Sequence, residues 1–329
     1  MLAQPGSRLL SEAERAGIPA LPLRMRGAWD LAATFAVRAI VRSRVIDLVH
    51  THSSIDSWVA GLAARSLGLP IVRSRHVSIP IPRARALVYR LADRIITSGD
   101  AVARIVETAG VPRHRIVAIG PGIDTTRFHP GVSGEAVRAE LGLRGPAVGL
   151  VANIRGSKGH RFFLEAARDV LRRRPDARFL IVGDGIGFDD VRRRVTELGL
   201  DEHVIMTGFR RDVPEVMAAL DVLVLPSVKS EAMSQVIPQA LAVGTPVVGT
   251  TVGGTPELVR DGETGRVVPP ADAPALAAAI ADLLAAPARA RELARRGQAE
   301  VLARHSMEAA MTRTVAVYED ARSARRRRS

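Results

Sequence analysis

Short apolar runs alternate with helix-patterned segments along almost the whole chain, and this alternation limits the possible folds more than any other feature. In the first part, the expected strands are 18–23, 47–52, 70–76, 94–99 and 115–122, with helices at 54–67 and 100–109. In the second part, they are 147–153, 177–185, 203–208, 221–227, 245–250 and 265–270. Strands separated by helices form parallel sheets that are covered by helices on both faces. The sequence therefore predicts an α/β protein with two doubly wound, Rossmann-like domains.

A connector around 129–146 separates the two series. We expect an N-terminal domain over 1–142, completed by a C-terminal helix at 307–325, and a C-terminal domain over 146–306. The 329 residues suffice for two ordinary domains. The chain begins with MLAQPGSRLL, which resembles the end of the second strand of such a domain and the start of the helix that follows it. The N-terminal domain is therefore expected to lack its first strand and helix, roughly 30 residues at the size of a βαβ unit.

The charge balance narrows the classes of partner. A net charge of +13 favours an anionic partner, but aromatic residues make up only 3% of the chain and no zinc-finger or RRM-type signature is present. Nucleic acid is therefore not the expected partner, whereas an anionic membrane surface is retained. The absence of cysteine excludes disulfides and thiolate metal sites. No secretory signal is visible, and the uncharged stretch 234–256 is broken by prolines and glycines. We expect a cytoplasmic protein, peripheral on the inner face of the cytoplasmic membrane.

One of the two lysines of the chain lies in VANIRGSKGH, directly after the first strand of the second series. Ligands of doubly wound sheets lie outside the carboxyl ends of the strands. Arg155 and Lys158 are three residues apart there, and Gly156 and Gly159 permit tight turns and close approach of a phosphate. The pair is interpreted as a clamp for a diphosphate, and the alternative is an ordinary basic turn.

The second candidate stretch is SEAMSQVIPQALAVG, after the strand 221–227. A helix is expected to begin near Ser234 or Gln235 and to stop at Gly244, with its N-terminus offering free amides to an anion. Glu231 stands just ahead of this helix, and Gln239 shares a helix face with Gln235. Taken alone, Glu231 also fits a solvated loop acid.

The next stretch, GGTPELV (253–259), is interpreted as purely structural. Thr255 is expected to cap a helix in which Pro256 is the first residue.

These motifs resemble glycosyltransferase family 4, whose members have the GT-B fold and retain the configuration of the transferred sugar. In the second part, the matching stretches are IRGSKGHRFFLEAA, FLIVGDG, VIMTGFRRDVPEVMAALDVLVLPS, SEAMSQVIPQALAVGTPVV and GGTPELVRDGETGRVVPPAD. In the first part, they are DLVHTHSSIDSWVAGLAARSLGLPIVRSRH, ADRIITSGDAV and GPGIDTTRFHP. Together they cover nearly the whole chain.

The resemblance implies roles for individual residues. Arg155 and Lys158 would neutralise the donor diphosphate, and Glu231, the first acid of the family's E-x7-E motif, would hold sugar hydroxyls. Gln239 stands where the second acid usually binds the ribose, which is a departure from the motif. His76 matches the first-domain histidine that reaches the donor sugar.

The other implied donor-binding residues are Gly156, Asp184, Gly185, Phe209, Arg210, Met233, Ser234, Gln235 and Val236. Phe209 and Arg210 match the region that cradles the base. The resemblance implies no metal and no cofactor beyond the nucleoside-diphosphate-sugar co-substrate.

The implied reaction is a hexosyl transfer from a nucleoside-diphosphate-sugar to a hydroxyl of a saccharide or lipid-linked acceptor, in surface-polysaccharide, lipopolysaccharide or glycolipid assembly. Two alternatives stay open: a sugar-nucleotide 2-epimerase and a non-catalytic nucleotide-sugar-binding protein. The sequence does not specify the base or the sugar of the donor, the acceptor, the linkage or the oligomeric state. It also leaves open whether the chain is active without the missing N-terminal strand.

Overall fold

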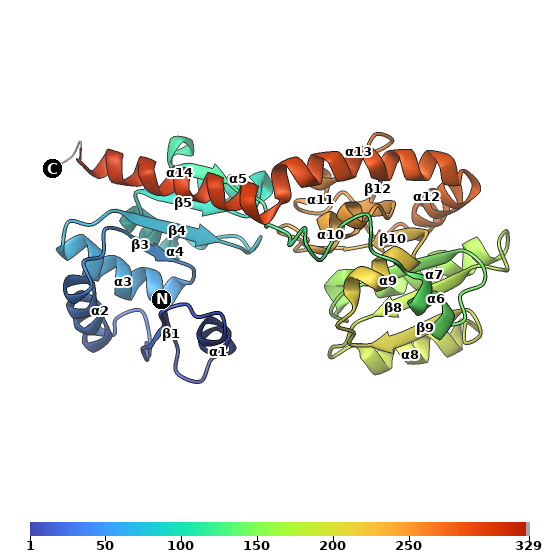
Figure 1. Cartoon of the computed structure of the whole chain (residues 1–329), viewed down its shortest axis with the longest axis horizontal. Helices are drawn as coiled ribbons and strands as arrows, with labels where there is room; N and C mark the ends of the chain where they lie inside the picture. The colour runs from blue at the N-terminus through green and yellow to red at the C-terminus, as the bar shows by residue number, and fades with distance from the viewer. Residues whose placement is uncertain (327–329) are drawn as a thin grey trace. The chain divides into compact units, whose positions relative to one another are not determined.

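The computed structural model describes residues 1–326, which form two compact units (Figure 1). Unit 1 contains Met1–Ser98, Val102–Ile119 and the chain from Arg313 onward. Unit 2 contains Gly99–Ala101 and Gly120–Thr312. The long C-terminal helix α14 (Met307–Arg326) thus starts in unit 2 and supplies its later turns to unit 1.

Unit 1 is built on a parallel sheet in the order β3-β4-β5-β6, beside a small parallel pair β1-β2. The strands are β1 (Leu2–Ala3), β2 (Leu21–Pro22), β3 (Val49–Thr51), β4 (Ile71–Arg75), β5 (Arg94–Thr97) and β6 (Ile116–Ala118). The helices are α1 (Arg8–Arg15), α2 (Leu31–Ser43), α3 (Ser54–Ser66), α4 (Arg83–Ala86) and α5 (Asp100–Thr108), with 3-10 turns at Leu87–Leu91 and Arg113–Arg115.

Helix α2 packs on α3 through a stripe of small and β-branched residues. Ala33, Val37 and Val41 recur every four residues and are buried against Val59 and Ala63 of α3. Ser53 and Asp56 form a capping box at the start of α3, which fixes where that helix leaves β3. The sequence therefore positions the amino end of α3 directly beyond the carboxyl end of β3.

Unit 2 carries a six-stranded parallel sheet in the order β12-β11-β10-β7-β8-β9. The strands are β7 (Ala147–Val151), β8 (Arg178–Val182), β9 (Val204–Gly208), β10 (Val222–Leu225), β11 (Val247–Thr250) and β12 (Arg266–Val268). The helices are α6 (Glu135–Glu140), α7 (His160–Leu171), α8 (Phe188–Glu197), α9 (Val213–Ala219), α10 (Val236–Val243), α11 (Thr255–Leu258), α12 (Ala273–Ala285) and α13 (Pro287–His305).

Both faces of this sheet are buried. Along β8, Phe179 and Ile181 point into one hydrophobic core, and Leu180 and Val182 point into the other. Successive residues of a strand face opposite sides of a sheet, so a strand buried on both faces is apolar without interruption. The first core is completed by α7, α8 and α12, and the second by α9 and α10.

The predicted strands are all present, each within the expected range and shorter by a few residues. Two local predictions were wrong. Thr255 is the first residue of α11 and does not cap it. The connector before 146, which the sequence placed in the first domain up to 142, packs with unit 2, because Val137 and Leu143 are buried in its second core.

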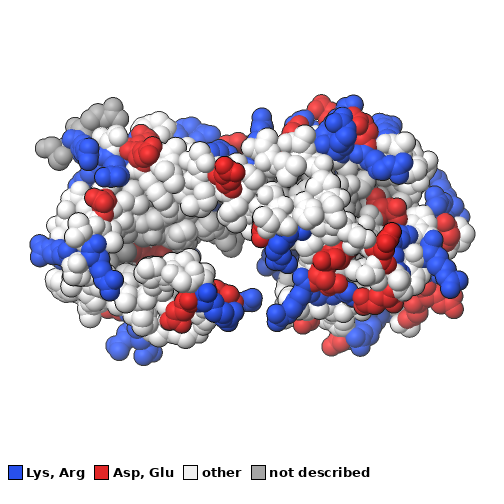
Figure 2. Space-filling model, in the orientation of Figure 1, with Lys and Arg blue, Asp and Glu red and all other residues white. Residues whose placement is uncertain are grey.

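In residues 1–326, no single helix is long and apolar enough to cross a membrane. Taken together, α12 and α13 have the length and composition of a membrane span, but they are bent by 103° at their junction. On the face shown in Figure 2, basic and acidic side chains are interspersed, so the positive net charge is not gathered there into one continuous patch.

Candidate active site

The topology of unit 2 reverses between β7 and β10. The chain runs from β7 through β8 to β9 on one side of β7, and β10, β11 and β12 then line up on the other side. Because neighbouring strands are parallel, the loops that follow β7 and β10 leave the same edge in opposite directions, which opens a crevice for a ligand. Lys158 follows β7 and Glu231 follows β10. Two of the predicted site residues therefore lie at the switch point of the sheet.

Lys158 and Glu231 contact each other directly. Nζ of Lys158 donates to Oε2 of Glu231 at 2.6 Å, and the hydroxyl of Ser227 donates to the same oxygen at 2.7 Å. The Lys158 and Glu231 side chains are only 13% and 9% exposed, so water screens their attraction weakly. Oε1 of Glu231 has no hydrogen-bond partner among residues 1–326 and is left to accept from a ligand hydroxyl.

The turn that carries Lys158 is fixed by the loop after β10. Gly156–Lys158 form a 3-10 turn, and Gly159 follows with φ 73°. A Cβ atom at Gly159 would lie 1.9 Å from the carbonyl oxygen of Pro226, so this position needs glycine for its backbone angle and for close packing. The Val228 amide donates to the carbonyl of Ser157 at 2.9 Å. The lysine is thus held in place by the strand that also leads to Glu231.

The loop that carries Glu231 is held by residues that the sequence analysis did not select. The Gly254 amide donates to the carbonyl of Glu231 at 3.1 Å, and a Cβ atom at Gly253 would lie 1.5 Å from that same oxygen. The Thr250 hydroxyl donates to the carbonyl of Ser227 at 2.6 Å. GGTPELV was interpreted as structural, but its two glycines support the acid. A glycine doublet separated by two residues from the end of β11 was the signal for this role.

The N-terminus of α10 lies just after Glu231. The amides of Met233, Ser234 and Gln235 have no hydrogen-bond partner in the described part of the chain, and the Val236 amide donates to the Ser234 hydroxyl at 3.3 Å. Gln235 is the N-cap, and its side chain makes no capping hydrogen bond. Free amides and the positive end of the helix dipole favour an anion here.

Gln239 lies one turn inside α10, where its own amide donates to the carbonyl of Gln235. Its half-buried side chain has no hydrogen-bond partner within residues 1–326.

Arg155 is not brought to Lys158. Its exposed guanidinium makes no ion pair or hydrogen bond in the described chain, and with Gly156 it lines a separate cavity of about 440 Å³ beside α7 and α8. Arg161 and Arg194 line the same cavity, but both are paired with Glu165. The two-cation clamp expected from the sequence is thus not assembled in this structure, because the two side chains leave the turn toward different surroundings.

His160 follows Lys158 by two residues and is almost fully buried at the start of α7. Neither of its ring nitrogens has a hydrogen-bond partner. Burial, and secondarily the charge of Lys158, lowers the pKa of His160 to about 4. The imidazole is therefore neutral near pH 7, which leaves Lys158 as the positive charge of the turn.

Asp184 and Gly185 form the loop after β8. The Ile154 amide donates to the carbonyl of Asp184 at 2.8 Å, which joins this loop to the loop after β7. Gly185 has φ 150°, and a Cβ atom there would lie 2.5 Å from the Ile154 carbonyl oxygen. The Asp184 side chain is exposed and accepts a hydrogen bond from the Gly185 amide at 2.6 Å.

Phe209 and Arg210 follow β9 and differ in what they offer a ligand. The Phe209 ring is 72% exposed. The Arg210 guanidinium is held by Glu140 at 2.7 and 2.8 Å and also by Asp212. These two carboxylates raise the pKa of Arg210, which stays charged and engaged. The Phe209 ring is thus the more available of the two side chains for a nucleotide base.

His76 lies in unit 1, just after β4. Its Nε2 is 3.3 Å from Nδ1 of His52, which follows β3. His50 is held by the hydroxyls of Tyr318 and Ser74 at 2.7 and 2.8 Å. Burial lowers the pKa of all three histidines, that of His50 to about 3. His76 thus belongs to a histidine cluster that is predominantly neutral near pH 7.

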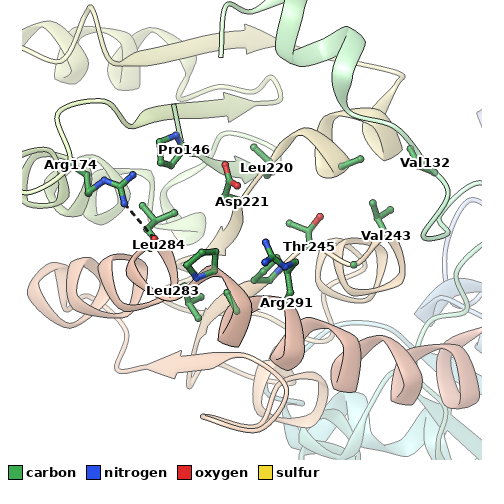
Figure 3. A pocket seen from close by; sticks show the side chains of 15 residues that line it. Val132, Pro146, Arg174, Leu220, Asp221, Val243, Thr245, Leu283, Leu284 and Arg291 are labelled. Atoms are coloured by element: carbon green, nitrogen blue, oxygen red, sulfur yellow. Dashed lines mark hydrogen bonds between the residues drawn. The ribbon is translucent and has the colours of Figure 1, made fainter. Parts of the chain in front are cut away.

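Another cavity, of about 420 Å³, lies at the amino ends of β7, β10 and β11 (Figure 3). Arg174, Asp221, Thr245 and Arg291 line it together with apolar residues. It contains none of the predicted site residues and lies at the sheet edge opposite to Lys158 and Glu231.

Comparison with known proteins places both parts of the chain in glycosyltransferase families. Residues 145–286 match the family model for glycosyl transferases group 1, and residues 2–127 match that for glycosyltransferase family 4. D-inositol 3-phosphate glycosyltransferase of Segniliparus rotundus is 31% identical over 83% of this chain and 66% of its own length.

A GDP-mannose-dependent phosphatidylinositol monomannoside mannosyltransferase of Mycolicibacterium smegmatis is 31% identical over 76% of this chain and 72% of its own length. The chain spans 55% to 66% of the length of the D-inositol 3-phosphate glycosyltransferases that it matches. The crystal structure of Anabaena HepE in complex with UDP superposes with a TM-score of 0.86 at 22% identity, over 94% of this chain and 88% of that one.

The superposition on HepE supports the GT-B architecture, since this chain has two α/β units, each built on a parallel sheet, and the strand order reverses in the sheet of unit 2. The identity to the mannosyltransferase extends over more than two thirds of that protein. The chain is therefore a member of glycosyltransferase family 4 with a GT-B fold.

Proposed function

We propose that the chain transfers a hexose from a nucleoside-diphosphate-sugar to a hydroxyl acceptor and retains the configuration at the transferred carbon. The observation that carries this proposal is the contact of Lys158 with Glu231 at the switch point of unit 2. A cation, an acid with one oxygen that has no partner among residues 1–326, and three free amides are carried by the loops that follow β7 and β10 at this switch point. This combination suits a ligand that has a diphosphate next to a polyhydroxyl ring.

In this proposal, the diphosphate lies between Lys158 and the amides of Met233 to Gln235. As the bond between the sugar and the diphosphate breaks, negative charge grows on the leaving oxygen, and these fixed donors stabilise that charge. Oε1 of Glu231 accepts a hydrogen bond from a sugar hydroxyl. Within residues 1–326, the carboxylate that contacts Lys158 is that of Glu231, whose Oε2 is held by Lys158 and Ser227, and we assign it no role as nucleophile. We therefore propose a front-face displacement: the acceptor oxygen bonds to the sugar carbon on the side that the diphosphate leaves, the bond between that carbon and the diphosphate breaks, and the leaving diphosphate oxygen takes the proton of the acceptor hydroxyl.

His76 is proposed to contact the sugar during transfer. Its position at the carboxyl end of β4 and its neutral imidazole suit a hydrogen bond to a sugar hydroxyl. The reaction is proposed to need no metal ion, since Lys158 and the helix N-terminus supply the positive charge. Full activity in the presence of EDTA tests this point, and loss of activity that Mg²⁺ restores would contradict it.

The decisive test is incubation of the chain with UDP-, GDP- and ADP-sugars, with and without acceptor glycosides, followed by product analysis. UDP and GDP are included because HepE was solved with UDP and the mannosyltransferase depends on GDP-mannose. A new α-linked glycoside that forms only with acceptor supports the proposal. Conversion of the donor sugar without acceptor would favour the 2-epimerase. Ligand-induced stabilisation without any product would favour a binding protein.

The acceptor is proposed to be a saccharide or lipid-linked molecule of surface-polysaccharide, lipopolysaccharide or glycolipid assembly, met at the inner face of the cytoplasmic membrane. The net charge of +13 and the exposed Leu31 and Phe35 of α2 support contact with an anionic bilayer. Flotation with vesicles that contain phosphatidylglycerol tests this contact. Absence of binding at low salt would refute it.

A further inference from the structure

Both tryptophans of the chain meet in unit 1. The rings of Trp29 and Trp58 are stacked, with centroids 5.1 Å apart and planes inclined by 30°. Trp29 is 74% exposed, whereas Trp58 is partly buried against the hydrophobic core beneath α3. The pair therefore presents one indole to solvent and supports it from behind with the other.

The loop that carries Trp29 is fixed by hydrogen bonds before any ligand arrives. The two carboxylate oxygens of Asp30 accept from the amides of Arg26 and Ala33, each at 3.0 Å. The Thr34 hydroxyl donates to the carbonyl of Asp30 at 2.9 Å. A side chain on such a loop loses little conformational freedom on binding, so its exposed surface is available at low entropic cost.

The position of the pair suits a second substrate. Trp58 lies in the second turn of α3, which begins directly after β3, so the pair is near the carboxyl ends of the unit 1 strands. His52 follows the same strand, and Asp56 accepts from its amide at 2.9 Å. Ligands of doubly wound sheets lie at this edge. The edge of unit 1 therefore offers an aromatic surface and polar groups together.

An exposed indole face is complementary to a particular chemistry. The C–H groups on one face of a pyranose ring pack on an aromatic ring, while the hydroxyls at the ring edge need hydrogen-bond partners. The indole N–H groups of Trp29 and Trp58 have no hydrogen-bond partner in residues 1–326, and neither do the exposed guanidinium groups of Arg24 and Arg26 on the same loop, although the charge of Arg26 acts on Asp30. These groups donate hydrogen bonds, and the hydroxyl oxygens of a sugar ring and its substituents can accept them.

We propose that Trp29, supported by Trp58, is the stacking platform for the sugar ring of the acceptor. This inference rests on the proposed function, since it names the acceptor of that transfer as a saccharide. In that proposal the donor binds to unit 2, so the proposed donor site and the proposed acceptor site can be refuted separately. The competing occupant of the exposed indole is a lipid bilayer, which is one outcome of the test below.

With excitation at wavelengths where tyrosine does not absorb, the intrinsic fluorescence of the chain reports on this pair alone, because Trp29 and Trp58 are its two tryptophans. We expect titration with methyl α-D-glucopyranoside, methyl α-D-mannopyranoside and their disaccharides to shift the emission saturably. Trp29→Ala should abolish the shift, although Trp58 still emits. Phe35→Ala removes another exposed aromatic side chain, on α2, and is the matched control that should leave the titration unchanged.

A second readout separates the platform from the donor site. Trp29→Ala should raise the KM for the acceptor at least tenfold and leave unchanged the thermal shift given by a donor sugar nucleotide, which also shows that the variant is folded. A fluorescence shift with anionic vesicles and none with any saccharide would overturn the proposal, as would an unchanged acceptor KM in Trp29→Ala. If the wild-type chain does not bind a donor sugar nucleotide, that result counts against the proposed function instead.

Discussion

Nζ of Lys158 lies 2.6 Å from Oε2 of Glu231, and these two residues come from loops on opposite sides of the point where the sheet of unit 2 reverses. The contact is nearly buried, and Ser227 adds a second donor to the same oxygen. In the proposed function, a ligand diphosphate would thus meet a cation that is already positioned, and the acid partner of that cation would keep one oxygen for a hydroxyl.

Lys158→Ala should lower turnover by ~10²-fold or more, the scale of losing one preorganised donor to a developing charge. It should also lower the free energy of unfolding by about 3 kcal/mol, because Glu231 is left buried without its cation. Lys229→Ala removes the other lysine of the chain, which is exposed, and should change neither quantity. Initial rates and urea denaturation measure both. Wild-type rates in Lys158→Ala would remove this residue from the site.

Gly253→Ala should displace Glu231, because the new Cβ atom would lie 1.5 Å from the Glu231 carbonyl oxygen. We expect at least a tenfold fall in kcat/KM together with a lower Tm. Gly262→Ala is a matched control, since Gly262 also has positive φ but no atom within 4 Å of its Cβ position. That control should cost about 1 kcal/mol of stability from backbone strain and leave kcat/KM unchanged. Equal kcat/KM values for the two variants would disprove the supporting role of Gly253.

Gln239→Glu should tighten the binding of a donor nucleotide by about fivefold. A carboxylate accepts a stronger, charge-assisted hydrogen bond from a hydroxyl than an amide does, and a gain of about 1 kcal/mol corresponds to that factor. Gln239→Leu should weaken binding, because the side chain then accepts no bond. Isothermal titration with the preferred sugar nucleotide measures both variants. Identical dissociation constants for glutamate, glutamine and leucine would show that position 239 does not face the donor.

Acid should destabilise the fold through His160. Its pKa is lowered from 6.5 to about 4 in the folded chain, so below pH 6.5 the unfolded chain binds a proton that the folded chain does not. Above pH 6.5 the contribution of the neutral His160 to the free energy of unfolding is fully present. As the pH falls from 6.5 to 4, the free energy of unfolding decreases by about 1 kcal/mol for each pH unit.

His160→Leu keeps an apolar side chain at the buried position and should lose part of this acid sensitivity. Urea denaturation midpoints at pH 7.5, 6 and 5 give the comparison, and His114→Leu, at an exposed histidine, serves as the control. An identical pH dependence in wild type and His160→Leu would contradict the pKa assignment.

The sequence alone was sufficient to predict the strands of the two larger sheets and some of the helices, among them α3, α5 and α14, for a local reason. Each strand is an apolar run bounded by turn residues, as with β8 between Asp176 and Gly183, and doubly buried strands give the clearest such signal. The end of α10 was also predicted from a local signal, because Gly244 follows the helix and adopts φ 97°. Lys158 and Glu231 were also identified, because both follow strands and their residue types suit an anionic, hydroxylated ligand.

The support of the site could not be read from the sequence. Ser227, Thr250 and Gly253 act on Glu231 through contacts that exist only after β10 and β11 lie side by side. Likewise, Trp29 and Trp58 are unremarkable in the sequence and meet only because α2 packs on α3. For Arg155 and Arg210, the structure adds surroundings that the sequence does not specify, a cavity beside α7 and α8 for Arg155 and the Glu140 carboxylate for Arg210, and their roles toward the donor stay predictions.

Local pattern thus predicted the strands and the fold class, and it selected Lys158 and Glu231 as candidate site residues. Tertiary structure decided which cation faces the acid, since Arg155 and Lys158 are both cationic residue types and the side chains leave a short turn in different directions. That direction depends on packing between segments far apart in the chain. Periodicity and spacing contain no information about such packing.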